Sequence, residues 1–203
     1  MDFAFTQEQD AIRDTARRFA VDRLAPDFRQ RELDRCIGRD VITEMGALGL
    51  IGADLPSQFG GLGLDCVTAG IIIEEIAAAD LSVSYINLIA SLNGQMLAAH
   101  ASPELAAKSI GDLCAGRSIT ALGLTEPGGG SDAANLKLRA RRDGDDYVLD
   151  GEKTSISLST QADVILLFAR TGSEDERAHG VSTFYAPLDG PGISRTEFDD
   201  MGS

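Results

Sequence analysis

The residues best suited to binding chemistry lie in one short segment that reads Leu122-Gly-Leu-Thr-Glu-Pro-Gly-Gly-Gly-Ser-Asp132. Its three consecutive glycines lack the Cβ atoms that would hold a flat or phosphorylated ligand away, and they permit backbone conformations closed to other residues. Pro127 restricts one φ angle, while Thr125 and Ser131 place a hydroxyl group on either side. The segment therefore predicts a loop that approaches a ligand closely, with an ordinary surface turn as the alternative.

Two known phosphate-binding loops do not fit this segment. Gly128-x-Gly130-x-x-Ala133 formally matches the dinucleotide-binding fingerprint, which requires a helix after the glycines and a parallel strand. Residues 137–142 and 147–150 instead form two short alternating runs around Asp143-Gly144, which predicts an antiparallel hairpin. No Gly-Lys-Ser/Thr sequence closes the loop, so the P-loop is excluded as well.

The elements that must position this loop change type near residue 116. Apolar spacing after Thr6-x-x-Gln9 predicts a first helix with a capping box. Further helices are expected over 39–48, 66–79 and 82–101, with another opening at Ser102-Pro103. After Gly116, β-branched and alternating runs predict strands at 118–124, 164–169 and 181–186.

We therefore expect an α+β protein with two domains. Residues 1–116 would form an all-helical domain, and residues 117–203 an antiparallel β-barrel-like domain that is incomplete at its C-terminal end. An open sheet edge is a liability, so the chain is interpreted as a fragment, a cleaved product or a natural half-subunit.

Composition narrows the class of protein. The formal net charge of −14 argues against nucleic-acid binding, which depends on Lys and Arg. The sequence contains no signal peptide or membrane-spanning apolar run, which predicts a cytoplasmic protein without a membrane partner. Cys36, Cys66 and Cys114 are expected to be reduced core residues, and His100 and His179 are too isolated for a metal site.

Several motifs in order resemble the middle segment of acyl-CoA dehydrogenases. These motifs are Thr125 to Asp132, Asp143-Gly144, Tyr147-Val-Leu-Asp-Gly-Glu-Lys153 and Ala162-Asp163-Val-Ile-Leu-Leu-Phe-Ala-Arg170. The resemblance reaches the start of the chain through Leu55-Pro56-x-x-Phe59-Gly60-Gly61-x-Gly63. It implies α,β-dehydrogenation of an acyl-CoA substrate by an FAD-dependent enzyme. It also implies an electron-transfer flavoprotein or similar acceptor and a homo-oligomer, namely a homotetramer.

The resemblance also implies roles for individual residues. The residues matched to the FAD site are Leu122, Leu124, Thr125, Gly130, Ser131, Ser155 and Ser157. Ser131 would also reach the pantetheine arm of the thioester, and Tyr85, Ile89 and Asn93 would line the acyl chain from one helix face. In the family the catalytic base lies in a C-terminal helical bundle. No base is therefore assigned here, and we expect it beyond Ser203 and the isolated chain to be inactive.

Two features leave alternatives open. Ser155 stands where the family commonly has Trp, and Thr154-Ser-Ile-Ser157 weakly resembles dehydrogenases of alicyclic acyl-CoA esters such as cyclohexanecarboxyl-CoA. One strand face would carry Lys137, Arg139 and Arg141, and we expect that face to be exposed to solvent. We expect the same of the helix flank that bears Glu74 and Glu75. The alternative functions are a non-catalytic binding subunit of a split complex and another flavin oxidase on the same scaffold.

Overall fold

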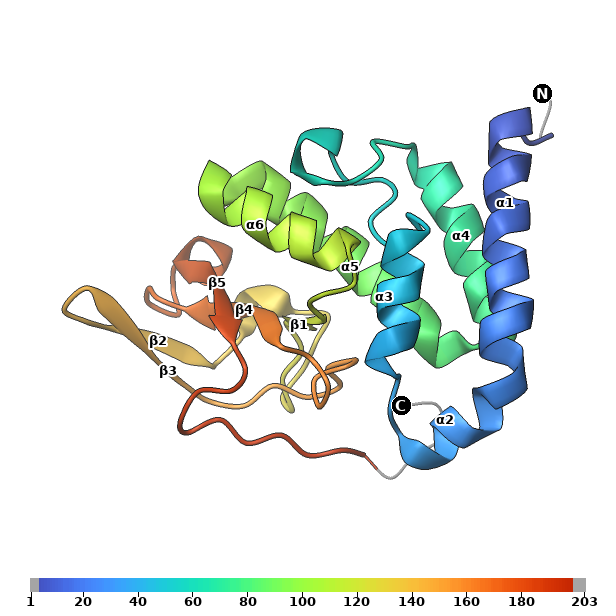
Figure 1. The fold of residues 1–203 in the computed structure, drawn as a ribbon. Helices are drawn as coiled ribbons and strands as arrows, with labels where there is room; N and C mark the ends of the chain where they lie inside the picture. The colour runs from blue at the N-terminus through green and yellow to red at the C-terminus, as the bar shows by residue number, and fades with distance from the viewer. Residues whose placement is uncertain (1–3, 199–203) are drawn as a thin grey trace. The chain divides into compact units, whose positions relative to one another are not determined.

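A computed structural model describes residues 4–198, which form two compact units (Figure 1). One unit is Thr120–Thr196, and the described residues on either side of it form the other. Thr120–Thr196 contains all the described strands and is called the β unit, whereas the other unit is helical and is called the helical unit. The expected order of a helical region followed by a β region is confirmed.

The helical unit follows the capping signals of the sequence. Its main helices are α1 (Gln7–Phe19), α2 (Phe28–Asp34), α3 (Arg39–Ala47), α4 (Cys66–Ala79), α5 (Leu81–His100) and α6 (Pro103–Cys114). A π turn (Ala20–Leu24) and a 3-10 turn (Ala25–Asp27) join α1 to α2, and Ser57–Phe59 forms another 3-10 turn. Thr6 and Gln9 form the predicted capping box, and Asp65, Asp80 and Ser102 cap α4, α5 and α6.

The helices pack around a dense apolar core. The largest fully buried apolar side chains are Leu24, Ile42, Met45, Leu55, Ile72, Ile76, Val83, Ile110, Leu113 and Ile119. Gly46 lets α3 approach the end of α6, because a Cβ atom there would lie 2.4 Å from the carbonyl carbon of Ala115. Asp80 connects two elements, since one carboxylate oxygen caps α5 and the other accepts a 2.7 Å hydrogen bond from Arg31.

The β unit is a five-stranded mixed sheet. Its strands are β1 (Thr120–Gly123), β2 (Arg139–Asp143), β3 (Asp146–Asp150), β4 (Val164–Arg170) and β5 (Val181–Pro187). The strand order is β1-β4-β2-β3, with β5 paired to β4. Short 3-10 turns occupy Ala133–Asn135 and Arg177–Gly180.

The sheet corrects the expectation of a wholly antiparallel, barrel-like domain. The β2–β3 and β4–β5 pairs are antiparallel, but β1 runs parallel to β4, with Leu122 opposite Leu166, and β2 meets β4 in parallel at Arg139 and Arg170. Over residues 4–198 the sheet is not closed into a barrel. The central strand β4 is mostly buried, as its continuous apolar run predicts.

Several side-chain expectations can be compared with the structure directly. The three cysteines are free, but Cys36 and Cys66 are exposed, so only Cys114 is a core residue. Glu74 is exposed as expected, whereas Glu75 is largely covered and pairs with Arg17 at 2.6 Å. Among the described residues, no helix is long and apolar enough to span a membrane, and no cluster of ligand side chains could hold a metal ion.

Candidate flavin-binding loop

The glycine loop, residues 127–132, leaves β1 through a tight turn. Glu126 and Gly129 exchange backbone hydrogen bonds of 3.2 and 3.0 Å. Gly129 has φ +155°, a conformation that side chains rarely adopt, whereas Gly128 and Gly130 are not in that region. A Cβ atom added at Gly128 or Gly129 would meet no protein atom within 4 Å, so the tip presents bare backbone to open space.

A buried carboxylate supports the loop from below. The Glu126 carboxylate accepts backbone hydrogen bonds from Lys137 at 2.6 Å and Leu138 at 2.8 Å, and it pairs with the Lys153 ammonium group at 2.9 Å. Lys153 also donates to the Leu124 carbonyl oxygen at 3.1 Å. The Glu126 and Lys153 side chains are only 8% and 6% exposed.

The charge of Glu126 follows from these contacts. Burial by itself raises the pKa of this carboxyl group, because a low dielectric disfavours the ionised form. The hydrogen bonds from Lys153, Leu138 and Lys137 act in the opposite direction and more than offset burial, so the pKa of Glu126 lies below its ordinary value. Glu126 is therefore ionised at neutral pH and unsuited to receiving a proton from a substrate.

A second segment, residues 153–158, runs beside the base of the glycine loop. The Thr154 backbone N–H donates to the Thr125 carbonyl oxygen at 3.0 Å. Ser155 and Leu158 have φ angles of 55° and 64°, so this segment turns twice through a conformation unusual for residues other than glycine. Gly130 lies close to the Thr125 side chain, since a Cβ atom added at Gly130 would lie 3.1 Å from the Thr125 methyl carbon.

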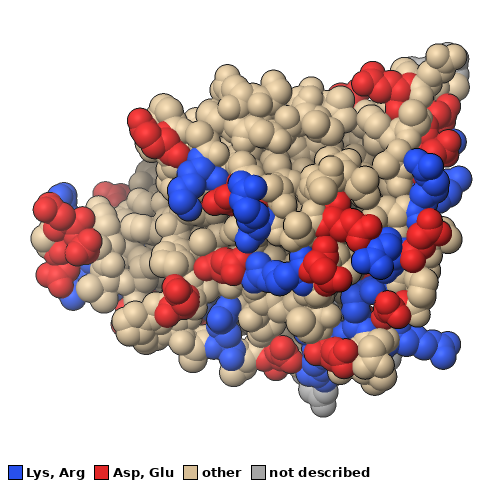
Figure 2. Space-filling model, viewed as in Figure 1, with Lys and Arg blue, Asp and Glu red and all other residues tan. Residues whose placement is uncertain are grey.

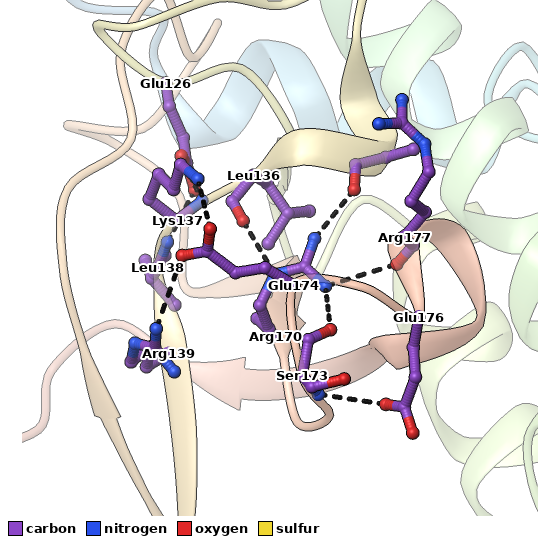
Figure 3. Close-up of polar contacts among 11 residues, drawn as sticks. Glu126, Leu136, Lys137, Leu138, Arg139, Arg170, Ser173, Glu174, Glu176 and Arg177 are labelled. Atoms are coloured by element: carbon purple, nitrogen blue, oxygen red, sulfur yellow. Dashed lines mark hydrogen bonds and ion pairs between the residues drawn. The ribbon is translucent and has the colours of Figure 1, made fainter.

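A buried arginine secures the far end of the loop (Figure 3). The Arg170 guanidinium group donates to the carbonyl oxygens of Ala134, Leu136, Ser173 and Arg177, at 2.7 to 3.2 Å. Only 3% of this residue is exposed. Arg170 thereby ties the residues that follow the glycine loop to the loop between β4 and β5.

Exposed ion pairs surround this arrangement. Glu174 pairs with Lys137 at 3.1 Å and with Arg139 at 3.5 Å, and Arg177 pairs with Asp132 at 3.1 Å. The hydrogen bond from Lys137, together with its charge, lowers the pKa of Glu174. Three basic residues that alternate in the sequence are exposed to solvent, as expected; they are Lys137, just before β2, and Arg139 and Arg141 within it.

The structure brings most of the predicted cofactor residues together. Leu122 lies in β1, Leu124 and Thr125 follow it, Gly130 and Ser131 end the glycine loop, and Ser155 and Ser157 belong to the adjacent second segment. Thr125 and the second segment thus meet at the base of the loop, while the two carboxylates of residues 124–132, Glu126 and Asp132, are both in ion pairs. This arrangement suits binding of a ligand rather than proton transfer.

The proposed acyl-lining residues lie in the helical unit on α5. Tyr85 is half-buried, whereas Ile89 and Asn93 are 8% and 0% exposed and belong to the core of that unit. Leu81, Leu88 and Leu92 recur at helical spacing with Tyr85 and are exposed. An acyl-lining role for Tyr85, Ile89 and Asn93 remains a prediction.

Sequence reasoning missed the Glu126–Lys153 pair and the role of Arg170. Both partners of the pair belong to motifs recognised in the sequence, but they are 27 residues apart. The sequence gives one local indication of the pair, because Glu126 and Lys153 both lie beside apolar runs. A charged side chain buried among such residues needs a partner of opposite charge. Arg170 was seen only as the end of a strand motif.

Comparison with known proteins identifies the relatives of the chain. Residues 6–117 match the acyl-CoA dehydrogenase N-terminal domain, and residues 121–203 match the acyl-CoA dehydrogenase middle domain. The probable acyl-CoA dehydrogenase YngJ of Bacillus subtilis (strain 168) is 31% identical over 100% of this chain and 54% of its own length. The mitochondrial isobutyryl-CoA dehydrogenase of Dictyostelium discoideum is 33% identical over 93% of this chain and 45% of its own length.

Solved structures with similar folds include a dehydrogenase and an electron transferring flavoprotein. Glutaryl-CoA dehydrogenase from Mycobacterium smegmatis in complex with FADH2 has a TM-score of 0.86 and 29% identity, covering 96% of this chain and 49% of its own. A structure of the electron transferring flavoprotein of Acidaminococcus fermentans has a TM-score of 0.89 and 31% identity, covering 98% of this chain and 53% of its own. The chain spans about half the length of the curated relatives it matches.

Proposed function

This chain belongs to the acyl-CoA dehydrogenase family, and we propose that it forms the flavin-binding part of an FAD-dependent enzyme that oxidises an acyl-CoA thioester to the 2-enoyl-CoA. The observation that carries this proposal is the glycine loop, whose tip is open and free of side chains. The FADH2 complex of a related dehydrogenase supports FAD as the cofactor. We place the boundary between the helical and β domains near residue 116, ahead of β1.

The residues around the loop fit a flavin nucleotide. The backbone at Leu122 and Leu124 and the Thr125 hydroxyl would bind the hydrogen-bonding edge of the ring. Gly130 and Ser131 would accept the closer approach of the ribityl-pyrophosphate. The Ser155 and Ser157 side chains would contact the ring from the second segment. Bound there, FAD supplies the hydride-accepting centre for the β-hydrogen of the substrate.

The substrate side of the proposal rests on α5. Tyr85, Ile89 and Asn93 would face the acyl chain, and Ser131 the pantetheine arm. Because Ile89 and Asn93 are buried in the helical core, we infer that Tyr85 contributes most of the direct contact. Cyclohexanecarboxyl-CoA and related alicyclic esters are the substrates that the Thr154 to Ser157 sequence favours.

The remaining parts of the reaction need groups from outside the matched flavin loop. The two carboxylates of residues 124–132 are held in ion pairs, which makes them unsuited to act as the catalytic base. From the family resemblance we propose that the base is a residue beyond Ser203. An electron-transfer flavoprotein is the acceptor we propose, and the structural match to a structure described as an electron transferring flavoprotein supports it. The assembly we propose is a cytoplasmic homotetramer.

Gly128→Ala tests the flavin proposal without disturbing the fold. The added methyl group meets no protein atom within 4 Å, and Gly128 does not have a positive φ. If FAD approaches this backbone closely, the methyl group should weaken FAD binding at least tenfold, measured by quenching of flavin fluorescence, while the melting temperature stays the same. A methyl group in unoccupied space would instead leave the affinity unchanged.

Three further variants complete the experiment. Gly70→Ala adds a methyl group to an exposed position of α4, where nothing lies within 4 Å, and should leave FAD binding unchanged. Thr125→Val keeps the side-chain volume and removes one hydrogen bond, with an expected loss of about 0.5–1.5 kcal/mol of binding free energy. Gly130→Val should abolish binding, with circular dichroism as the check on folding. Normal FAD affinity in Gly128→Ala, Gly130→Val and Thr125→Val together would show that the loop is only a turn.

A further inference from the structure

Two buried side chains of opposite charge form hydrogen bonds with the backbone of residues 134–138, which follow the glycine loop. Arg170 donates to the carbonyl oxygens of Ala134 and Leu136, and Glu126 accepts from the N–H groups of Lys137 and Leu138. Within five residues, the carbonyl groups are thus held by a cation and the N–H groups by an anion. Glu126 and Arg170 are the charged residues of the β unit that are buried as whole residues, at 7% and 3% exposed, among those described.

Glu126 differs from Arg170 in what else it connects. Its partner Lys153 begins the second segment and donates to the carbonyl oxygen of Leu124, the residue after β1. The Glu126–Lys153 pair therefore joins three stretches of chain: the residues just after β1, those just before β2 and the second segment. Arg170 connects residues 134–136 to the β4–β5 loop instead.

Among residues 4–198, none makes a comparable contact with the tip of the glycine loop. Pro127, Gly128 and Gly129 are exposed, and a Cβ atom at either glycine would meet only open space. The position of the tip relative to the second segment must therefore be set at the base of the loop. A buried ion pair with complementary backbone donors is rigid there, because breaking it leaves an uncompensated charge in the interior.

We propose that Glu126, paired with Lys153, is a positioning residue that holds the glycine loop and the second segment at the separation that the flavin requires. Glu126 acts through the backbone and does not touch the cofactor. The inference rests on the proposed function for its link to FAD, whereas the positioning of the loop is a property of the chain alone.

Glu126→Gln is the central test, because it keeps the size of the side chain and removes its charge. The amide retains one acceptor oxygen for two backbone N–H groups and leaves Lys153 unpaired. Hydrogen exchange of the ligand-free chain should accelerate at least tenfold at the Lys137 and Leu138 amides and in residues 153–158. FAD affinity should fall at least tenfold. Exchange in the helical unit should stay unchanged.

Glu174→Gln is the matched control. Glu174 is also a carboxylate of the β unit paired with a lysine, at 3.1 Å, but its side chain is 54% exposed. Removing its charge should change neither the exchange of residues 137, 138 and 153–158 nor the FAD affinity. Loss of FAD affinity in Glu174→Gln equal to that in Glu126→Gln would assign the effect to the general charge of the unit and overturn the proposal.

The double variant Glu126→Gln/Lys153→Met separates positioning from simple instability. Lys153→Met alone should destabilise the chain, since it leaves the Glu126 charge buried without its cation. The double variant removes both charges, so its melting temperature should recover toward that of the unsubstituted chain. If the ion pair positions the loop, FAD affinity should stay low in the double variant despite that recovery. Recovery of both quantities would make Glu126 a merely structural residue and overturn the proposal.

The remaining outcomes are also decisive. Unchanged exchange at residues 137 and 138 in Glu126→Gln would refute positioning by this carboxylate, whatever the FAD affinity. Faster exchange with unchanged FAD affinity would refute the link to the flavin. If the unsubstituted chain does not bind FAD at all, the proposed function fails and the flavin link with it, while the exchange measurement still decides the positioning role.

Discussion

At the scale of single residues, the three cysteines differ in the solvent exposure of their thiol groups. Cys36 and Cys66 are exposed, whereas Cys114 at the end of α6 is 7% exposed and lines a cavity of about 440 Å³ beside α3. Burial, helped by the negative charge of Asp54, raises the pKa of the Cys114 thiol to about 11. Its reactive thiolate form is therefore scarce at neutral pH.

Thiol titration should distinguish these residues. At pH 8, Cys36 and Cys66 should react quickly with Ellman's reagent, and Cys114 should react only after denaturation. The raised pKa also affects stability: the contribution of the protonated Cys114 is present below the ordinary thiol pKa of about 8.5 and is lost as pH rises toward 11. A Cys36→Ser/Cys66→Ser variant that still reacted quickly when folded would contradict this account.

At the scale of elements, the sequence was most informative where local signals coincide. The helix over 66–79 was predicted to the residue, and in the structure Asp65 is the N-cap of this helix and Asp80 the N-cap of the next. The β2–β3 hairpin followed from alternation around Asp143-Gly144. Helix α2 was not predicted, and none of its residues is buried, so no apolar periodicity marks it.

Non-local pairing explains the other errors. Nothing within β1 indicates that it pairs in parallel with β4, since strand partners depend on residues far along the chain. The same holds at the candidate site. The glycine loop was visible as a motif, whereas Glu126–Lys153 spans 27 residues and Arg170 reaches carbonyls up to 36 residues away. Local propensity specifies elements better than their contacts.

Two helical glycines provide a matched test of close packing. Gly46→Ala in α3 would place Cβ 2.4 Å from the Ala115 carbonyl carbon, and backbone cannot yield easily, so we expect a loss of about 1–3 kcal/mol in the free energy of unfolding. Gly70→Ala in α4 meets nothing within 4 Å and should stabilise the helix by about 0.5–1 kcal/mol. Urea denaturation measures both. Equal effects of the two substitutions would contradict the packing of α3 against the end of α6.

At the scale of the whole molecule, the net charge of −14 must be reconciled with the proposed binding of two phosphorylated ligands, FAD and an acyl-CoA. Acidic and basic side chains lie beside one another on the face shown in Figure 2. Within the β unit, Lys137, Arg139 and Arg177 pair with nearby carboxylates, so much of the local charge is already neutralised. In the proposed FAD complex, we expect backbone N–H groups of the glycine loop, rather than these paired cations, to donate hydrogen bonds to the phosphates.

The distribution of carboxylates leads to a prediction for the reaction as a whole. Dehydrogenation of an acyl-CoA needs a carboxylate free to take the α-proton. Glu126 is held by Lys153 and two backbone N–H groups, and Asp132 by Arg177. Neither is therefore free to act as the base, and the family resemblance implies a base beyond Ser203. We expect the 203-residue chain to bind FAD but to show no turnover of butyryl-CoA, glutaryl-CoA or cyclohexanecarboxyl-CoA with an artificial electron acceptor. The Bacillus subtilis relative serves as the full-length comparison. Steady turnover by this chain alone would place the catalytic base within residues 1–203 and refute the proposal that it lies beyond Ser203.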